Sequence, residues 1–371
     1  MTQSPRQELL AIQKKLWKWN RDMIKRSVLV KEPGFDRYEA AYRNAVKDFK
    51  RVSSQDEMID DVMKSDIIYV GDYHTCNQSQ RSFLRILKAT VKRTKKFAVG
   101  LELLHKRHQK VLDDYLSGRE KEEGFLKKIK LKEHWVFDLW ENFKPLFDFC
   151  RYHKIPIYAI DAAKDGSNVR KRDQATAKLI GDIISADPER RLFVFIGDLH
   201  IAPKHLPADV DRELSVRGLV RNSLILYQNS ESIYWDLARQ EVEDYVEIVK
   251  LKDGNYCRMH TPPVVAQRSY LNWLEHEEGE IDYSDAKSSF IELVDRICDF
   301  LKLDVGAAKD EVEVFTSGDL TFLQRLKEKG DFSDKEIAMI KKQILASESY
   351  YISKAKIAYL ANLSINHAAE E

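Results

Sequence analysis

The feature that most constrains the fold is a rhythm of short apolar runs separated by helical patterns. The candidate strands are residues 66–70, 96–103, 155–160, 191–196 and 223–228. Nearly continuous apolar runs are typical of strands that helices cover on both faces. Helical spacing fills residues 79–93, which begin at the candidate cap Ser79, and residues 168–185. This alternation predicts an α/β fold with a largely parallel sheet flanked by helices.

Segments outside this rhythm suggest how the chain is divided. The expected parts are an N-terminal helical segment (1–64), the α/β domain (65–261), a small helical subdomain inserted into it (104–154), and a mainly helical C-terminal region (262–371). The insertion is expected because the chain between two strands is too long there for a single crossover helix. A hairpin is expected over residues 246–260, turning at Asp253 and Gly254, and one further strand over 311–316.

Composition and charge exclude some classes of protein. Hydrophobic residues make up 43% and charged residues 33%, which fits a globular protein with a substantial core. The formal net charge is +1, so nothing global favours nucleic acid as a partner. The first 50 residues are basic and the last 100 are acidic. This asymmetry leaves two interpretations open, a basic N-terminal helix docked on an acidic C-terminal part, or two solvated faces.

The cysteines and the N-terminus bear on location. Cys76, Cys150, Cys257 and Cys298 are far apart and form no CxxC motif, so they predict neither a zinc ribbon nor a disulfide framework. The N-terminus lacks the apolar core of a signal peptide and an early cysteine for lipidation. No apolar run is long enough to span a bilayer. We therefore expect a cytoplasmic protein.

The ends of the candidate strands carry the chemistry. The first and fourth runs end in the same pattern, Gly-Asp-x-His, which places Asp72 with His74 and Asp198 with His200. The other polar residues at strand ends are Glu102 and His105 after the second run, and Asp161 after the third. Ligands of open α/β sheets bind outside the carboxyl ends of the strands. We therefore expect these side chains to share one edge of the sheet.

Three uses of such an edge remain open. His74, Glu102 and His200 could bind a divalent metal ion, since imidazole and carboxylate are suitable ligands. The same residues with Asp72 could form an acid–base set without a metal, each histidine being oriented by a carboxylate. The edge could also line a pocket for a larger cofactor. A single Asp after a strand is often a helix cap, but the repeated motif favours function over that interpretation.

A group of aromatic residues occurs in the predicted insertion. Its members are Trp135, Phe137, Trp140, Phe143, Phe147 and Tyr152. Aromatic residues at helical spacing usually belong to a core. Rings that faced the strand edge would instead form an apolar roof suited to a flat hydrophobic ligand.

Taken in order, these motifs resemble a known family. The pieces are "IIYVGDYH", "AVGLELLHKRHQKVLDDYLSG", "LWENFKPLFDFCRYHKIPIYAID" and "LFVFIGDLHIAPKHLP". Together they resemble the ChaN-like haem-binding uptake family, which belongs to the Tiki/TraB and erythromycin-esterase superfamily. The resemblance covers roughly residues 60–260 and implies an α/β domain with a small inserted helical domain. Asp72 stands where the family usually has Glu.

The resemblance implies a ligand and a site. Asp72, His74, Glu102 and His200 fall on the functional positions of the superfamily. ChaN-like members bind haem through a tyrosine, which makes Tyr73 and Tyr115 candidate ligands here. The residues expected to line the cofactor pocket with them are His105, Asp161 and Asp198. Haem or a small molecule is thus the expected partner, and a role in iron uptake, a bound divalent metal and a homodimer are further expectations. The alternative is a hydrolase, dependent on a metal or assisted by His and Glu, because enzymatic members use this residue set for hydrolysis.

Overall fold

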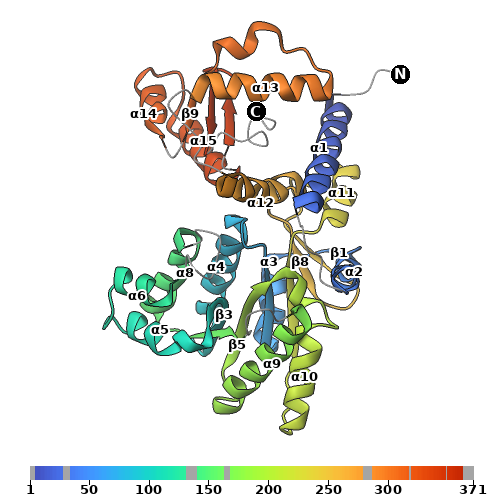
Figure 1. Ribbon diagram of the computed structural model, residues 1–371, viewed down its shortest axis with the longest axis vertical. Helices are drawn as coiled ribbons and strands as arrows, with labels where there is room; N and C mark the ends of the chain where they lie inside the picture. The colour runs from blue at the N-terminus through green and yellow to red at the C-terminus, as the bar shows by residue number, and fades with distance from the viewer. Residues whose placement is uncertain are drawn as a thin grey trace. The chain divides into compact units, whose positions relative to one another are not determined.

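The computed structural model describes residues 5–27, 34–130, 140–162, 168–278, 286–316, 319–347 and 349–361. The chain forms two compact units, Val28–Pro263 and a second unit of Met1–Ser27 with Val264–Glu371 (Figure 1). Residues 28–64 thus group with the central sheet and residues 1–27 with the C-terminal part. We expected residues 1–64 to form one segment, and the assignment of domains stays a prediction.

The first unit is built around an eight-stranded sheet. Its strands are β1 (Arg51–Val52), β2 (Ile67–Asp72), β3 (Phe97–His105), β4 (Ile157–Asp161), β5 (Arg191–Gly197), β6 (Ser223–Gln228), β7 (Ile248–Lys250) and β8 (Tyr256–Arg258). Its helices are α2 (Phe35–Ala45), α3 (Gln55–Lys64), α4 (Asn77–Val91), η1 (Lys106–His108), α5 (Gln109–Leu116), α6 (Glu122–Ile129), α8 (Trp140–His153), α9 (Val169–Ala186), η2 (Asp198–Ile201), α10 (Leu206–Val216) and α11 (Glu231–Arg239).

The strand order of this sheet is β1-β7-β8-β6-β2-β5-β3-β4. The pairs from β8 to β4 are parallel, while β1, β7 and β8 pair antiparallel. All five strands predicted from apolar runs are confirmed, as is the hairpin, which forms β7 and β8. The two-residue strand β1 carried no sequence signal.

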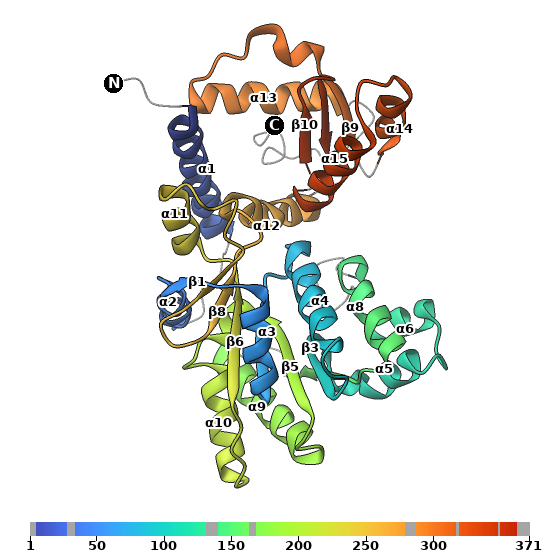
Figure 2. The same cartoon turned by 180° about the vertical axis from the view of Figure 1, so that it is seen from behind.

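Helices cover both faces of the sheet, which explains the continuous apolar runs. Ile68 and Val70 of β2 join a core cluster with residues of α3, α4 and α8. Their neighbour Tyr69 is fully buried and senses the charge of Asp211 on α10, so it faces the opposite layer. Figure 1 views the sheet from the side of α9 and α10, and Figure 2 from the side of α3 and α4.

The predicted helical insertion is present between β3 and β4. Trp140, Phe143 and Phe147 are buried in the core cluster, which confirms the core interpretation for these three rings. Tyr152 is 82% exposed and belongs to no core. The other two aromatic residues expected here, Trp135 and Phe137, lie outside the described residues.

Two helix starts can be compared with their sequence signals. The prediction that Ser79 caps its helix is wrong, because α4 begins at Asn77 and Ser79 is already inside it. The N-cap is Cys76, whose side chain makes no capping hydrogen bond. Helix α9 begins as predicted, and the Asn168 side chain accepts a hydrogen bond from the Lys171 N–H at 3.0 Å.

The second unit is helical with a small sheet. Its elements are α1 (Pro5–Ser27), α12 (Pro263–Glu278), α13 (Ala286–Leu301), η3 (Gly306–Glu311), β9 (Glu313–Thr316), α14 (Thr321–Glu328), α15 (Asp334–Ser347), β10 (Ser349–Ile352) and β11 (Ile357–Leu360). Strand β9 is the one predicted here, and it pairs parallel with β11. The basic helix α1 packs on this part, with the Trp19 ring 5.5 Å from that of Phe300. In the described parts of the chain, no helix combines the length and apolarity that crossing a membrane requires.

Candidate functional site

The strand order reverses its direction between β2 and β5. These two strands are parallel neighbours, and Asp72 lies opposite Gly197 in their register. From β2 the chain proceeds to β3 on one side, whereas from β5 it proceeds to β6 on the other side. Such a reversal of direction is a topological switch point, where ligands of open α/β sheets bind. Both Gly-Asp-x-His motifs therefore end at the switch point.

Glu102 lies at the centre of the cluster that forms there. It comes from β3, the strand beyond β5, and its side chain is only 6% exposed. The Gly197 N–H donates to Oε2 at 2.7 Å, and the Arg172 guanidinium donates to Oε1 at 2.9 Å. The Nε2 atom of His74 lies 3.7 Å from Oε2, and the Nε2 atom of His200 lies 3.7 Å from Oε1. The two imidazoles thus flank one carboxylate.

A carboxylate orients each histidine from behind. The Nδ1 atom of His74 lies 2.9 Å from Asp72 Oδ2, and that of His200 lies 2.6 Å from Asp173 Oδ1. An ionised carboxylate only accepts hydrogen bonds, so Nδ1–H is the donor in both pairs. This leaves both Nε2 atoms, which face Glu102, as the available acceptors in the neutral rings.

Both orienting carboxylates are held in turn. Gln80 of α4 donates from Nε2 to Asp72 Oδ1 at 2.6 Å. The Tyr38 hydroxyl donates to Asp173 Oδ2 at 2.8 Å and lies 3.0 Å from His200 Nδ1. The Tyr38 ring stacks on that of His205 at 3.6 Å, which fixes the phenol from the other side. Each histidine therefore has little freedom to rotate.

Gly197 leaves room for this arrangement. A Cβ atom on this residue would lie 3.2 Å from His74 Nε2, 3.4 Å from Glu102 Oε2 and 3.4 Å from His200 Cδ2. It belongs to β5, which leads to His200 and lies between β2, which leads to His74, and β3, which carries Glu102. A side chain on the middle strand would occupy the point toward which all three groups converge.

Charge in the cluster is strongly biased. Burial favours neutral Glu102, but the charges of His200, His74 and Arg172 outweigh it and lower the pKa of Glu102 to about 2. Burial also opposes charge on His74, yet its hydrogen bond to Asp72 and that residue's charge raise its pKa. Burial raises the pKa of Asp72. Glu102 is thus the stable anion, and its charge favours the imidazolium form of His74.

Asp198 has a different environment from Asp72, although the two occupy the same place in their motifs. Its Oδ1 atom is buried without a hydrogen-bond partner, and a Cβ atom on Gly71 would lie only 2.0 Å from it. Burial, followed by the charge of Asp72, raises the pKa of Asp198 to about 8. Asp198 is therefore mainly neutral at pH 7.

The other residues predicted for the cofactor site are dispersed. His105 lies opposite Asp161 in the β3–β4 register, and its Nδ1 accepts from the Arg107 N–H at 3.1 Å. Tyr115 is 2% exposed and stacks on Phe125 within the insertion, at 4.4 Å. Tyr73 is half-buried directly after β2, beside the cluster. Of the two candidate tyrosines, only Tyr73 lies at the strand edge.

The described residues form no recognisable metal site. No group of three or more His, Cys, Asp or Glu side chains among those residues has the arrangement to hold one. Both oxygens of Glu102 already accept hydrogen bonds, from Gly197 and Arg172. The metal site stays a prediction.

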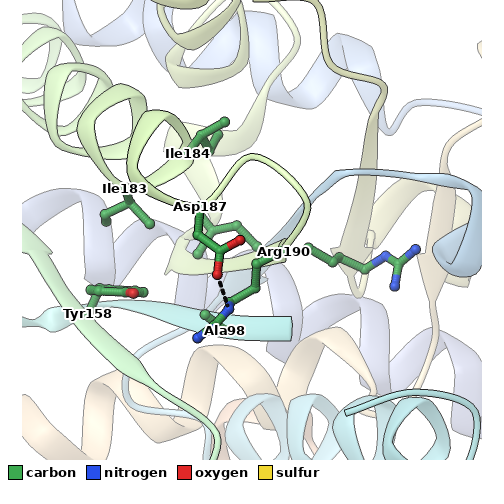
Figure 3. A pocket seen from close by; sticks show the side chains of 8 residues that line it. Ala98, Tyr158, Ile183, Ile184, Asp187 and Arg190 are labelled. Atoms are coloured by element: carbon green, nitrogen blue, oxygen red, sulfur yellow. Dashed lines mark ion pairs between the residues drawn. The ribbon is translucent and has the colours of Figure 1, made fainter. Parts of the chain in front are cut away.

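Two hollows in the described part of the first unit bear on the binding of a flat cofactor. The hollow in Figure 3 has a volume of about 10 Å³ and lies at the start of β3 and β5, beside Ala98 and the ion pair of Asp187 with Arg190. That is the edge opposite Glu102, with room for about one water molecule. A groove of about 440 Å³ runs along α9 and α10, and none of its lining residues is a His, Tyr, Cys or Met. The first hollow includes the Tyr158 ring but is far too small for haem, and the second provides no axial ligand of the usual types for haem iron.

Sequence reasoning missed part of the cluster. Arg172, Asp173, Tyr38 and Gln80 lie inside helices, where charged and polar residues are ordinary. One signal was available for Asp173, because it occurs near the start of a helix that follows a strand ending at the same edge. Tyr38 is 162 residues from His200 in the chain and gave no such signal.

Part of this unit is similar to a known protein family. Residues 58–168 match the family model described as "Haem-binding uptake, Tiki superfamily, ChaN". The match confirms the resemblance there. It includes Asp72, His74 and Glu102, while Asp173 and His200 lie beyond it. No curated protein matches the chain.

Solved structures show weak similarity. One is ChaN of Campylobacter jejuni, in a structure described as "cofacial heme binding". It is 17% identical to this chain, and the match covers 57% of this chain and 96% of that chain, with a TM-score of 0.38. The type III effector HopBA1 is 13% identical, with 58% and 98% covered and a TM-score of 0.39. RRSP, a MARTX toxin effector domain from Vibrio vulnificus, is 15% identical, with 61% and 46% covered and a TM-score of 0.32.

Proposed function

We propose that the strand-end cluster, whose residues Asp72, His74 and Glu102 lie in the segment that matches the ChaN family model, binds a small molecule and hydrolyses it without a metal ion. One observation carries this proposal. The Nε2 atoms of His74 and His200 each lie 3.7 Å from a different oxygen of Glu102. The sequence alone favoured haem binding over hydrolysis, and the side-chain geometry supports hydrolysis better.

The cluster has the parts of a general acid–base centre. A base needs an oriented lone pair, and the hydrogen bond from Nδ1 to a buried carboxylate supplies it on both rings. The side chain of His74 is 26% exposed and that of His200 is 9% exposed. Solvent therefore reaches His74 more readily, which favours His74 as the group that activates water.

The proton transfers balance within the cluster. Water attacks the carbonyl carbon of an ester or amide and gives a proton to Nε2 of His74. Protonated His200 gives its Nε2 proton to the leaving oxygen or nitrogen. The ionised Glu102 stabilises whichever ring is an imidazolium, and Arg172 offsets the negative charge when neither ring is charged. The reaction ends with one proton to be returned from His74 to His200 through solvent.

A substrate panel tests this function. We expect chromogenic esters and amides to be cleaved by the purified protein, with kcat lowered at least 100-fold in His74→Asn, Glu102→Gln and His200→Asn. His153→Asn on α8 is the control and keeps full activity. The assay is run with and without a chelator. Cleavage of no substrate, or equal activity in all four variants, would rule the hydrolase out, and loss of activity in chelator would overturn the metal-free mechanism.

Haem binding is the second candidate, and the family description supports it. Tyr73 is the residue that would supply an axial oxygen, because it is half-buried at the strand edge. The phenol of Tyr115 is enclosed by Phe125, and burial raises its pKa, which disfavours the phenolate that iron prefers. Haem, when bound, would supply an iron centre to this edge.

A haemin titration separates the two tyrosines. We expect saturable binding with a shifted Soret band in the wild type and in Tyr115→Phe, and a weakened or altered band in Tyr73→Phe. The absence of saturable binding at micromolar haemin would reject this candidate without affecting the hydrolase proposal.

A further inference from the structure

An arginine is buried without a counter-ion at the end of β8. Arg258 is 4% exposed, and its Nη1 atom has no hydrogen-bond partner. Among the described residues, no side chain lies within ion-pair distance of it, although the Glu247 charge attracts it from farther away. Burying a charge costs several kcal/mol unless it is paired, so such a group calls for an explanation.

The nearest charges add to this imbalance. Arg85 of α4 is exposed and close enough to act on Arg258 by repulsion. His260 contributes no negative charge, and both arginines with burial lower its pKa to about 3. Its ring nitrogens lie 2.7 Å from Thr261 Oγ1 and 3.2 Å from Gln228 Oε1, so they are already engaged. Among the residues that the structure describes, neither Arg258 nor Arg85 forms an ion pair with a carboxylate.

The position of this pair in the sheet relates it to the site. Arg258 lies opposite Gln228 in the parallel β6–β8 register, so it stands at the carboxyl edge of the sheet. The Gln228 amide donates to the carbonyl oxygens of Gly71 and Ser79, which ties this end of β6 to β2 and α4. Two strand spacings separate the end of β8 from that of β2, about 10 Å.

We infer that Arg258 and Arg85 form an oxyanion site that takes a phosphate group. Guanidinium donors in a planar fork match the oxygens of phosphate, and two of them balance its double charge. Binding would supply the counter-ion that the buried Arg258 lacks. The geometric basis of the site is the burial of Arg258, its unpaired Nη1 atom and its place at the end of β8. Only the further step, in which the phosphate belongs to a ligand whose other end reaches His74, rests on the proposed function.

Thermal unfolding in phosphate tests the site. The wild-type protein is unfolded in inorganic phosphate and in sodium chloride of equal ionic strength and pH. We expect the unfolding midpoint to rise by several degrees in phosphate relative to chloride, since an anion that binds only the folded state stabilises it. Acetate at equal ionic strength should give a smaller shift, and an equal shift would overturn the assignment to phosphate.

Two variants locate the effect. Arg258→Met removes the buried charge at similar volume, so it should unfold no earlier than wild type in chloride and should lose the phosphate shift. Arg85→Gln changes an exposed residue, so this variant should fold normally and show a smaller phosphate shift. It tests the phosphate site even if Arg258→Met is insoluble. Lys178→Gln on α9 is the control and keeps the shift. No phosphate shift in the wild type, or a full shift in Arg85→Gln and in any soluble Arg258→Met, would overturn the site.

Discussion

Asp72 and Gly197 lie directly opposite each other on β2 and β5, so the two Gly-Asp-x-His motifs meet one residue out of register. Equivalent residues of the motifs therefore occupy different places. Asp72 holds His74 within its own motif, at 2.9 Å. His200 is held by Asp173 from α9 instead, at 2.6 Å, and Asp198 is left in a separate buried position. The repeated motif thus gives two similar Asp–His pairs, one formed within a motif and the other formed with an Asp from α9.

Gly197→Ala should strongly reduce the proposed hydrolysis with a moderate effect on folding. The added methyl group would contact His74 Nε2 at 3.2 Å and Glu102 Oε2 at 3.4 Å, so these groups must move apart. Overpacking of this kind costs about 1–3 kcal/mol. We expect the proposed hydrolysis to fall at least tenfold, measured at a temperature where circular dichroism shows the variant to be folded.

Gly100→Ala is the matched control on the neighbouring strand β3. There a Cβ atom would meet the Ile160 side chain at 2.9 Å, within the packed sheet. We expect a comparable loss of stability with kcat retained. Loss of kcat in both variants alike would mean that Gly197 has no specific role.

Glu102 should make the protein less stable in acid. Its pKa of about 2 lies below the unfolded value of 4.5, so the stabilisation is present above about pH 4.5 and is lost as the pH falls through 2. The linked free energy is on the order of 3 kcal/mol. Glu102→Gln should therefore unfold with a flatter pH dependence between pH 5 and pH 2, measured by urea titration. Parallel curves for the two proteins would contradict this.

Tyr38→Phe should weaken catalysis through His200. The variant loses the 2.8 Å hydrogen bond to Asp173, while the ring can still stack on His205. We expect a stability loss of about 1 kcal/mol and a roughly tenfold lower kcat. The pH–rate profile should shift as well, because the hydrogen bonds around the Asp173 carboxylate change. Tyr245→Phe, at an exposed residue, is the control, and an unshifted profile with normal kcat would leave Tyr38 a purely structural role.

The sequence predicted the strand-end residues of this site better than the helical residues that hold them in place. Nearly continuous apolar runs identify β2, β3 and β5, and the residues that follow them must reach one edge when the strands are parallel. His74, Glu102 and His200 could be brought together on that basis alone. Tyr38 and Asp173 could not, because they reach the cluster from helices whose docking depends on tertiary packing. The role of Asp198 was equally hidden, since a one-residue difference in register leaves no trace in the motif.

Asp198→Asn should reveal a buried acid that destabilises the protein at alkaline pH. The pKa of Asp198, about 8, lies above the unfolded value of 3.8. Its contribution to stability is thus fully present below pH 3.8 and is lost progressively as the pH rises through 8. Asparagine does not ionise, so the variant should lose less stability than wild type between pH 5 and pH 9. The free energy of unfolding from urea titration at each pH measures this, and the difference should reach at least about 1 kcal/mol. Asp253→Asn, at an exposed hairpin turn, is the control with a wild-type pH dependence. If Asp198→Asn instead follows the wild-type curve, Asp198 is ionised in the folded protein and the charge balance of the cluster differs from that described.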